Sequence, residues 1–340
     1  RTFALRGRLS APELAATPMR NTRLSNVSRT TSDSSLAALT GEAGLGWQTA
    51  NLYGLTAGAG DVSCKLNEGV GVISLRDLPV SDGKVRLTSQ LRLDRTPAML
   101  VLQSERVIDK VRLSPELCAG WLKYAAPIMA DATRVDGRFS VVIANGALPI
   151  SDPSTGEIAG QFAVHEAQLT PGPFAAQVVT IVDRIKALTK SRSLKPADLL
   201  SLAEQSASPT NGGGNRAWVT LPEQEVPFRM TKGRVFHDGL TLVTKEATLR
   251  TRGSVGLDES LDLIVEVPVR DEWIAQNKSL NSLRGKSLQI PVRGSLTQPQ
   301  LDARALESLA RAAATAPVEN LLENELQKGL NRFLPGKKKP

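Results

Sequence analysis

Aromatic residues, cysteines and histidines are scarce in this chain of 340 residues. Aromatic side chains make up 4% of the sequence, and there are two cysteines and two histidines. Val, Leu, Ala, Thr and Ser dominate instead, which favours an extended sheet over an enzyme with a deep pocket. Cys64 and Cys118 are too few and too far apart for a disulfide framework or a metal site, although the sequence is also compatible with a single disulfide between them.

The sequence also lacks long apolar runs and any large concentration of charge. No run approaches the roughly 20 apolar residues of a membrane-spanning helix, so we expect a soluble or peripheral protein. The formal net charge is +8, but only Lys337 to Lys339 form a dense basic run. Arg250 and Arg252 have Thr248 and Ser254 on their face rather than aromatic rings, which argues against nucleic acid as a partner.

Residue patterns for catalysis or cofactor binding are missing as well. His165 and His237 lie in strand-like alternation without a Cys or His partner, so we interpret both as structural. The glycines 212–214 lack the Lys and Ser or Thr of a phosphate loop. The acidic pairs at 258–259 and 271–272 suit a turn and a helix start. The sequence therefore predicts a protein that is not an enzyme and has no catalytic residue, metal or cofactor.

What the chain does contain is alternation of apolar and polar residues, clearest from Ala247 to Val269. Two such runs are joined by a short polar turn at Asp258 to Ser260. Successive side chains of a strand point to opposite sides, so this spacing predicts a hairpin with one apolar and one polar face. The apolar face must be covered by protein, by lipid or by both. It carries Leu249, Thr251, Val255, Leu257, Leu261, Leu263, Val265, Val267 and Val269.

Similar alternation elsewhere, with short Gly, Asp and Asn connections, predicts an antiparallel meander. Helical stripes interrupt it, for instance after Ser114-Pro115, which suits a capped helix start. We divide the chain into five segments: 1–45, a strand and a flexible Ser/Thr-rich stretch; 46–170, a half-sheet with an inserted helix 114–131; 171–215, helices and a Gly-rich linker; 216–301, a second half-sheet with an inserted helix 271–283; and 302–340, a C-terminal amphipathic helix with a basic tail.

The expected fold class is α+β, with a mostly antiparallel, strongly curved sheet in the form of an open groove or half-barrel. Several amphipathic helices would pack on this sheet, and the C-terminal helix would cap it. That last helix is expected either to cover the end of the sheet or to lie on a membrane or a partner protein. Its apolar face carries Val318, Leu321, Leu322, Leu326, Leu330 and Phe333.

Three stretches give the sequence a family resemblance. They are Lys232 to Leu242, Gly253 to Leu263 and Ile290 to Leu301, and together they resemble the C-terminal region of AsmA-like proteins. In that family a "G-x-V-x-L-D-x-x-L-D-L" hairpin is followed by a helical insertion and a "P-V-x-G-T-L-x-x-P" strand. The resemblance covers residues 230 to 335. Ser295 replaces the usual Thr, and the final helix is unusually long.

The resemblance implies a protein of the periplasm or cell envelope of a didermic bacterium, anchored in the inner membrane by a segment upstream of Arg1. Its relatives form a long apolar groove thought to carry phospholipid for the outer membrane. The expected partners are phospholipid or another acyl-chain lipid and envelope membrane proteins. The alternative is a scaffold domain that binds its partner through the C-terminal helix. The expected lipid-facing residues are Leu249, Val255, Leu257, Leu263, Val265, Val267, Leu288, Ile290 and Val292.

Overall fold

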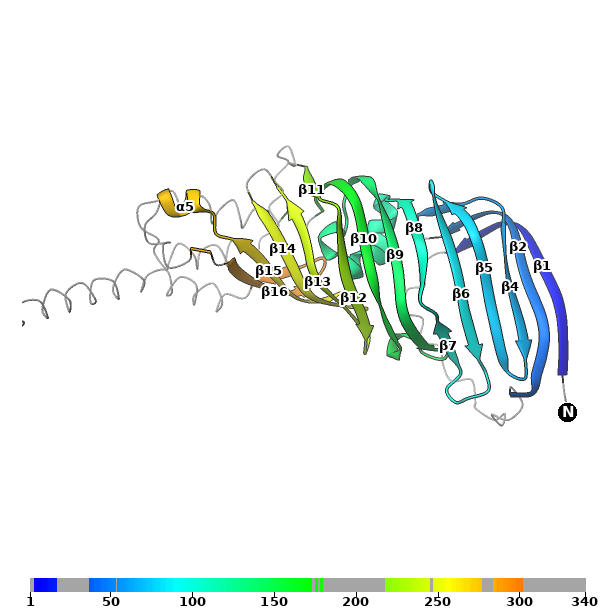
Figure 1. The fold of residues 1–340 in the computed structure, drawn as a ribbon. Coiled ribbons are helices and arrows are strands. Elements are labelled where there is room, and N and C mark those ends of the chain that lie inside the picture. The colour runs from blue at the N-terminus through cyan, green and yellow to red at the C-terminus, as the bar shows by residue number, and fades with distance from the viewer. Residues whose placement is uncertain are drawn as a thin grey trace, which may run out of the picture.

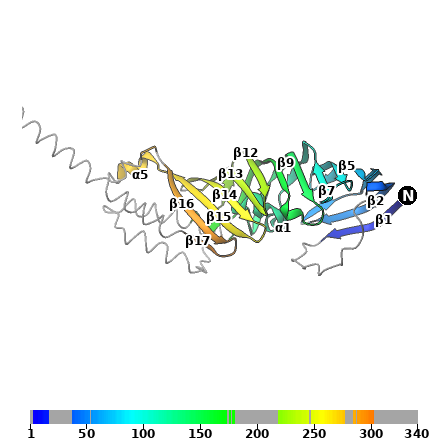
Figure 2. The same ribbon diagram turned by 90° about the horizontal axis from the view of Figure 1, so that it is seen from below.

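One long, twisted sheet dominates the protein (Figures 1 and 2). In this computed structural model, the sheet runs through both halves of the chain, and the proposed division into five segments stays a prediction. The structure describes residues 3–16, 37–52, 54–172, 175–176, 178–179, 218–244, 247–276, 284–285 and 287–301.

Seventeen strands form the sheet. They are β1 (Phe3–Ala16), β2 (Leu39–Leu52), β3 (Leu55–Ala57), β4 (Gly60–Asn67), β5 (Val70–Val80), β6 (Gly83–Arg92), β7 (Met99–Leu102), β8 (Glu105–Arg112), β9 (Arg134–Pro149), β10 (Glu157–Thr170), β11 (Val219–Leu221), β12 (Gln224–Thr231), β13 (Arg234–Val243), β14 (Thr248–Gly256), β15 (Ser260–Pro268), β16 (Ser287–Ser295) and β17 (Pro299–Leu301).

The strands pair in chain order as an antiparallel meander, as the sequence predicts, except that β1 and β2 are parallel. At three places two consecutive strands share one row of the sheet, which means that both pair with the same two neighbouring strands. These rows are β3 with β4, β7 with β8, and β11 with β12. Tight turns join several rows. Lys232 and Gly233 have φ angles of 50° and 67°, the left-handed conformation of the two-residue turns that match the twist of a hairpin.

The expected α+β class is wrong, because this is a mostly β protein. Of the described residues, 66% lie in strands and 13% in helices, and the long helical stretch has 11 residues. Helical stripes in the sequence indicated several amphipathic helices on the sheet. In the described residues the helical elements are short: α1 (Pro115–Leu117), η2 (Cys118–Leu122), α2 (Lys123–Ala125), η3 (Pro127–Met129), η4 (Pro153–Thr155) and α5 (Asp271–Gln276).

Local chemistry explains why the stretch from Pro115 to Met129 is broken. The hydroxyl of Ser114 accepts a hydrogen bond from the backbone N–H of Leu117, and Pro115 occupies the first turn. Gly120 then leaves the helical conformation at φ −76° and ψ −112°, inside a wide turn. Ala126, which precedes Pro127, is also non-helical, as expected of a residue before proline. We call Pro115–Met129 the helical segment.

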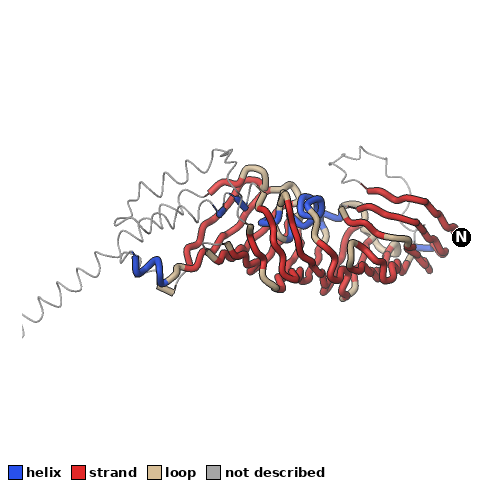
Figure 3. The backbone as a smooth tube through the Cα atoms, turned by 90° about the horizontal axis from the view of Figure 1, so that it is seen from above, coloured by secondary structure: helices blue, strands red, loops and turns tan. Residues whose placement is uncertain are grey.

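The helical segment packs against one side of the sheet, which we call the inner face (Figure 3). Phe139 and Phe162 of β9 and β10 lie beneath it, and the Trp121 ring meets the Phe139 ring edge-on at 5.6 Å between centroids. Cys118 is buried there, and both Cys118 and Cys64 are free thiols. This part of the core is therefore a layer between the inner face and the helical segment.

The outer face carries charged side chains of both signs. Arg252 on β14 places its Nε 2.8 Å from Oε1 of Glu266 on β15, and Arg293 on β16 lies 3.8 Å from Asp262. Such cross-strand pairs are partly exposed, so each contributes little to stability. The positive charge that is dispersed along the sequence is therefore explained by side chains on a solvated face of the sheet.

Candidate functional site

The nine residues predicted to face lipid lie on the inner face of β14, β15 and β16 or directly after β14. The strand register aligns Val255 with Leu261, Leu263 with Val292, and Val265 with Ile290. Since paired residues of neighbouring strands point to the same side, these side chains form one continuous apolar surface.

Burial divides these nine residues. Leu257 is 37% exposed and Leu288 is half-buried. The other seven belong to the main core, together with Ile274 of α5 and with Ala175 and Val178. That part of the inner face is closed in this structure. Whether any of the nine contacts lipid stays a prediction. The seven buried residues are Leu249, Val255, Leu263, Val265, Val267, Ile290 and Val292.

The second predicted surface, on the helix from Val318 to Phe333, lies outside the described residues, as does the region 302–340 as a whole. Its role as a cap or as a partner-binding helix stays a prediction. Among the described residues, no helix combines the length and hydropathy needed to cross a bilayer.

An apolar pocket of about 350 Å³ lies where the helical segment meets the inner face. Strands β8, β9, β10, β12 and β13 provide its floor, and Leu257 adds a side chain from the turn after β14. The Tyr124 hydroxyl and the Trp121 indole N–H are the polar side-chain groups in the lining. We call this the apolar pocket, lined by Ile108, Trp121, Tyr124, Ala125, Val141, Ile143, Ile158, Phe162, Phe228, Met230, Val235 and Leu257.

Backbone geometry brings these distant residues together. Met230 aligns with Ile158 across β12 and β10, and Val235 aligns with Met230 across β13 and β12. At the tip, the Leu257 N–H donates to the Gly233 carbonyl at 2.8 Å, which fixes the turn after β14 against the turn before β13. The pocket wall is therefore held by hydrogen bonds between successive turns.

One ion pair joins the two sides of the pocket wall. Lys123 Nζ lies 2.7 Å from Oε1 of Glu259; Lys123 precedes the pocket residue Tyr124, and Glu259 lies two residues after the pocket residue Leu257. Burial is the largest single effect and disfavours the charged Lys123, but the hydrogen bond to Glu259 together with the nearby groups of Tyr124, Glu259 and Asp131 outweighs it, so the pKa of Lys123 is raised. The pair thus fastens the helical segment to the β14–β15 turn.

A Lys123→Met variant is expected to lower the free energy of unfolding by about 1 kcal/mol, because it removes a partly shielded ion pair but keeps the apolar stem. Urea denaturation measures the change. Arg112→Met is the matched control, since the side chains of the Arg112–Asp82 pair are 59% and 51% exposed. Equal destabilisation by both substitutions would show that the Lys123 pair does not fasten the wall.

Beyond the pocket, the described part of the inner face in the N-terminal half is closed at Leu78, Val80 and Ser89 but not throughout. A row of aliphatic side chains there is half-buried rather than buried. The sequence pattern identified several of these residues as one face of a strand but could not show that they retain exposure. We call this row the inner strip: Leu45, Val62, Ile73, Leu75, Leu87, Leu91, Leu100 and Leu102.

The inner strip continues into the apolar pocket. Leu91 aligns with Leu100 across β6 and β7, and Leu102 aligns with Gly146 of β9, which in turn aligns with the pocket residue Ile158. A Cβ atom on Gly146 would lie 3.0 Å from Leu102 Cδ1, so the Leu102 side chain lies over the glycine. Apolar surface therefore extends from β2 to the pocket.

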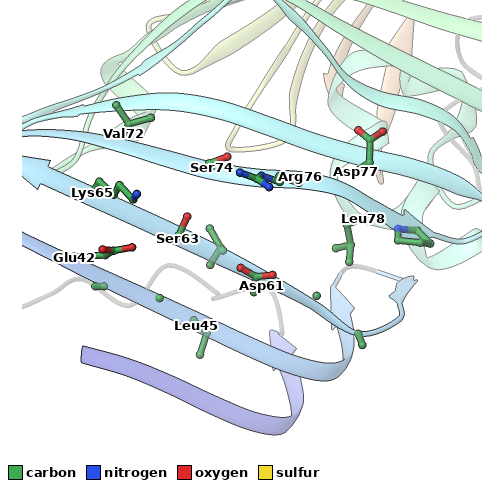
Figure 4. Close-up of a pocket in the computed structure, with 16 residues that line it drawn as sticks. Glu42, Leu45, Asp61, Ser63, Lys65, Val72, Ser74, Arg76, Asp77 and Leu78 are labelled. Atoms are coloured by element: carbon green, nitrogen blue, oxygen red, sulfur yellow. The ribbon is translucent and has the colours of Figure 1, made fainter. Parts of the chain in front are cut away.

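A larger hollow, of about 850 Å³, lies over β2, β4 and β5 (Figure 4). Its charged residues, which include Glu42, Asp61, Lys65 and Arg76, have both signs and lie on the face opposite the inner strip, although Leu45 and Val62 of the strip also belong to its lining. Within the described ranges, no three His, Cys, Asp or Glu side chains converge as a metal site would require. We interpret this hollow as solvated outer surface.

A serine, a histidine and a glutamate also come together, which sequence spacing did not indicate. Ser140 Oγ lies 2.8 Å from His165 Nε2, and His165 Nδ1 lies 3.7 Å from Glu223 Oε1. A catalytic serine must be reachable, but Ser140 is 2% exposed and its hydroxyl accepts the backbone N–H of Lys110. Lys110 lies where β8 loses register with β9, so the cluster satisfies an irregular backbone.

Comparison with known proteins gives no relative for this chain. No protein-family model matches it, and no curated protein or solved structure matches it either. The likeness to AsmA-like proteins stays a prediction that rests on the three stretches quoted above.

Proposed function

We propose that this chain binds the acyl chains of phospholipid, or of a similar lipid, on its inner face and does so without enzymatic chemistry. The observation that carries the proposal is the continuous apolar surface formed by the inner strip and the apolar pocket. Half-buried aliphatic side chains in a row leave apolar area in water, and such patches are typical of binding surfaces.

The energetics suit a chain-like apolar ligand. Each methylene group moved from water to the apolar surface contributes about 0.8 kcal/mol. Leu75, Leu87 and Leu91 offer aliphatic contacts along neighbouring strands, and the polar side chain among them, Ser89, is buried and uncharged. Affinity would therefore grow with chain length rather than depend on one headgroup contact.

The envelope location and the role in outer-membrane lipid homeostasis belong to this proposal. They rest on the resemblance to AsmA-like proteins and on the extended meander, which supplies a long surface rather than a compact active site. Because most of the predicted residues on β14–β16 are buried, the proposal assigns lipid binding to the inner strip and the apolar pocket instead.

An Ile73→Asp variant is expected to reduce lipid uptake about tenfold or more, because placing an acyl chain against a new carboxylate costs more than about 1.4 kcal/mol. Ile73 lies on the inner strip and aligns with Cys64 and Ser89. Uptake is measured by incubating protein with phosphatidylglycerol vesicles that contain a fluorescent phosphatidylglycerol, removing the vesicles, and quantifying lipid that stays with the protein.

The adjacent substitution Val72→Asp is the matched control. Val72 is 45% exposed on the outer face and aligns with Lys65, so a carboxylate there meets a positive charge and water. We expect uptake within about twofold of the unchanged chain. Thermal unfolding of both variants separates loss of binding from loss of fold. Unchanged uptake by a folded Ile73→Asp protein would contradict the proposal.

A further inference from the structure

The inner strip ends at the apolar pocket. On one side, Leu102 and Ile158 connect the pocket with the strip through Gly146. On the other side, the inner face beyond β13 is closed, with Leu249 and Val265 at 0% and 1% exposure. An extended apolar ligand that follows the strip therefore meets a blind end.

The walls of that end are fixed. Trp121 and Tyr124 of the helical segment form one side, and Leu257 of the β14–β15 turn forms another. The Lys123–Glu259 ion pair at 2.7 Å joins these two sides, next to the pocket residues in sequence. The pocket is thus a half-open hollow between two joined elements, and the inner face is closed on its β14–β16 side.

The chemistry of the lining decides which end of a lipid enters. No charged side chain lines the pocket, and its polar side-chain groups are the Tyr124 hydroxyl and the Trp121 indole N–H, so an ionised headgroup would lose its hydration without a charged partner. A terminal methyl group has no such cost. The volume of about 350 Å³ lies near the lower limit of about 300 Å³ for small-molecule pockets, which suits one chain rather than two.

We propose that the apolar pocket receives the methyl end of a single acyl chain, whose carboxylate or headgroup stays outside it toward the inner strip. This inference rests on the proposed lipid-binding function. It adds an orientation and a stoichiometry to that function: the chain enters methyl end first, and one chain occupies the pocket.

Methionine methyl groups provide a test on the unaltered protein. The chain has four methionines, of which Met230 lines the pocket and Met99 lies on β7, beside the inward-facing Leu100 and on the opposite face. The protein is labelled with carbon-13 at the methionine methyls, and Met230→Leu and Met99→Leu assign their signals. Stearic acid with a nitroxide at carbon 16 is then compared with stearic acid labelled at carbon 5.

We expect the carbon-16 label to broaden the Met230 signal more than the carbon-5 label does, and more than it broadens Met99. If both labels bind, as electron paramagnetic resonance of the immobilised nitroxide would show, but broaden Met230 equally or not at all, the orientation is wrong and lipid binding stands. If neither nitroxide is immobilised by the protein, the proposed function fails together with this inference.

Discussion

A Val265→Asp variant is expected to lose at least about 4 kcal/mol of stability, enough to unfold many domains of this kind. Val265 is 1% exposed and aligns with Thr251 on one side and Ile290 on the other. A carboxylate at this position would be buried in an apolar layer without a positive partner, and either its charge or its hydrogen bonds would stay unsatisfied.

Ile264→Asp is the matched control, one residue away on the outer face. Ile264 is half-buried and aligns with Arg252, so the new carboxylate meets a positive charge and solvent. We expect a change of about 1 kcal/mol or less. Urea denaturation followed by far-ultraviolet circular dichroism measures both variants. Similar midpoints would show that the inner face is open at β15, contrary to the burial of Val265.

Leu257→Asp separates folding from binding at the same hairpin. Leu257 is 37% exposed, so its replacement leaves the carboxylate within reach of water, and the fold should persist. The same carboxylate would place a charge in the lining of the apolar pocket. The contrast between Val265 and Leu257 therefore distinguishes the closed part of the inner face from the part that is available to a ligand.

Alternation along the sequence was enough to predict the strands of this hairpin and the face that each residue occupies. The register confirms that Thr251, Val255 and Leu261 share the inner face, because period-2 spacing is a local property of an extended chain. The short turns with glycine, such as Lys232-Gly233, likewise indicated antiparallel neighbours.

What covers a face could not be predicted in the same way. Val255 and Leu257 have the same spacing pattern, yet one is buried and the other is 37% exposed. Their difference depends on the helical segment more than 120 residues earlier and on the end of the strand, neither of which local periodicity describes. The helical stripe after Ser114-Pro115 likewise predicted one helix that Pro127 would kink or end, whereas Gly120 already interrupts the helical segment.

The apolar pocket was beyond prediction for a related reason. Its lining residues extend along the sequence from Ile108 to Leu257. Their contacts depend on the order of the strands and on irregularities in the register, such as the shift between β9 and β10 where Gly160 aligns with Ile143. An irregularity of one residue moves later side chains to the opposite face. Sequence alone does not show where such shifts occur.

Acidification to pH 4 is expected to remove about 3 kcal/mol of stability through His237. Its side chain is 3% exposed, its Nε2 lies 3.1 Å from Thr251 Oγ1, and among the described residues its Nδ1 has no hydrogen-bond partner. Burial lowers the pKa of His237 to about 4 from 6.5, and the nearby charge of Asp238 only partly opposes this. Between these values the unfolded chain binds the proton and the folded chain does not, so stability falls as pH falls.

A His237→Phe variant should lose this pH dependence, because a ring of similar shape replaces the titrating group and the Thr251 hydroxyl keeps the Leu240 carbonyl as acceptor at 3.5 Å. Free energies of unfolding are measured in urea between pH 7 and 4. Asp94, Asp109 and Asp258 have pKa values lowered below 3.8, so the loss of stability through their protonation begins at about pH 5, lies mostly below this window, and is the same in both proteins. If the free energy of unfolding falls equally with pH in His237→Phe and in the unchanged protein, His237 accepts a proton in the folded state and the inner face around it admits water.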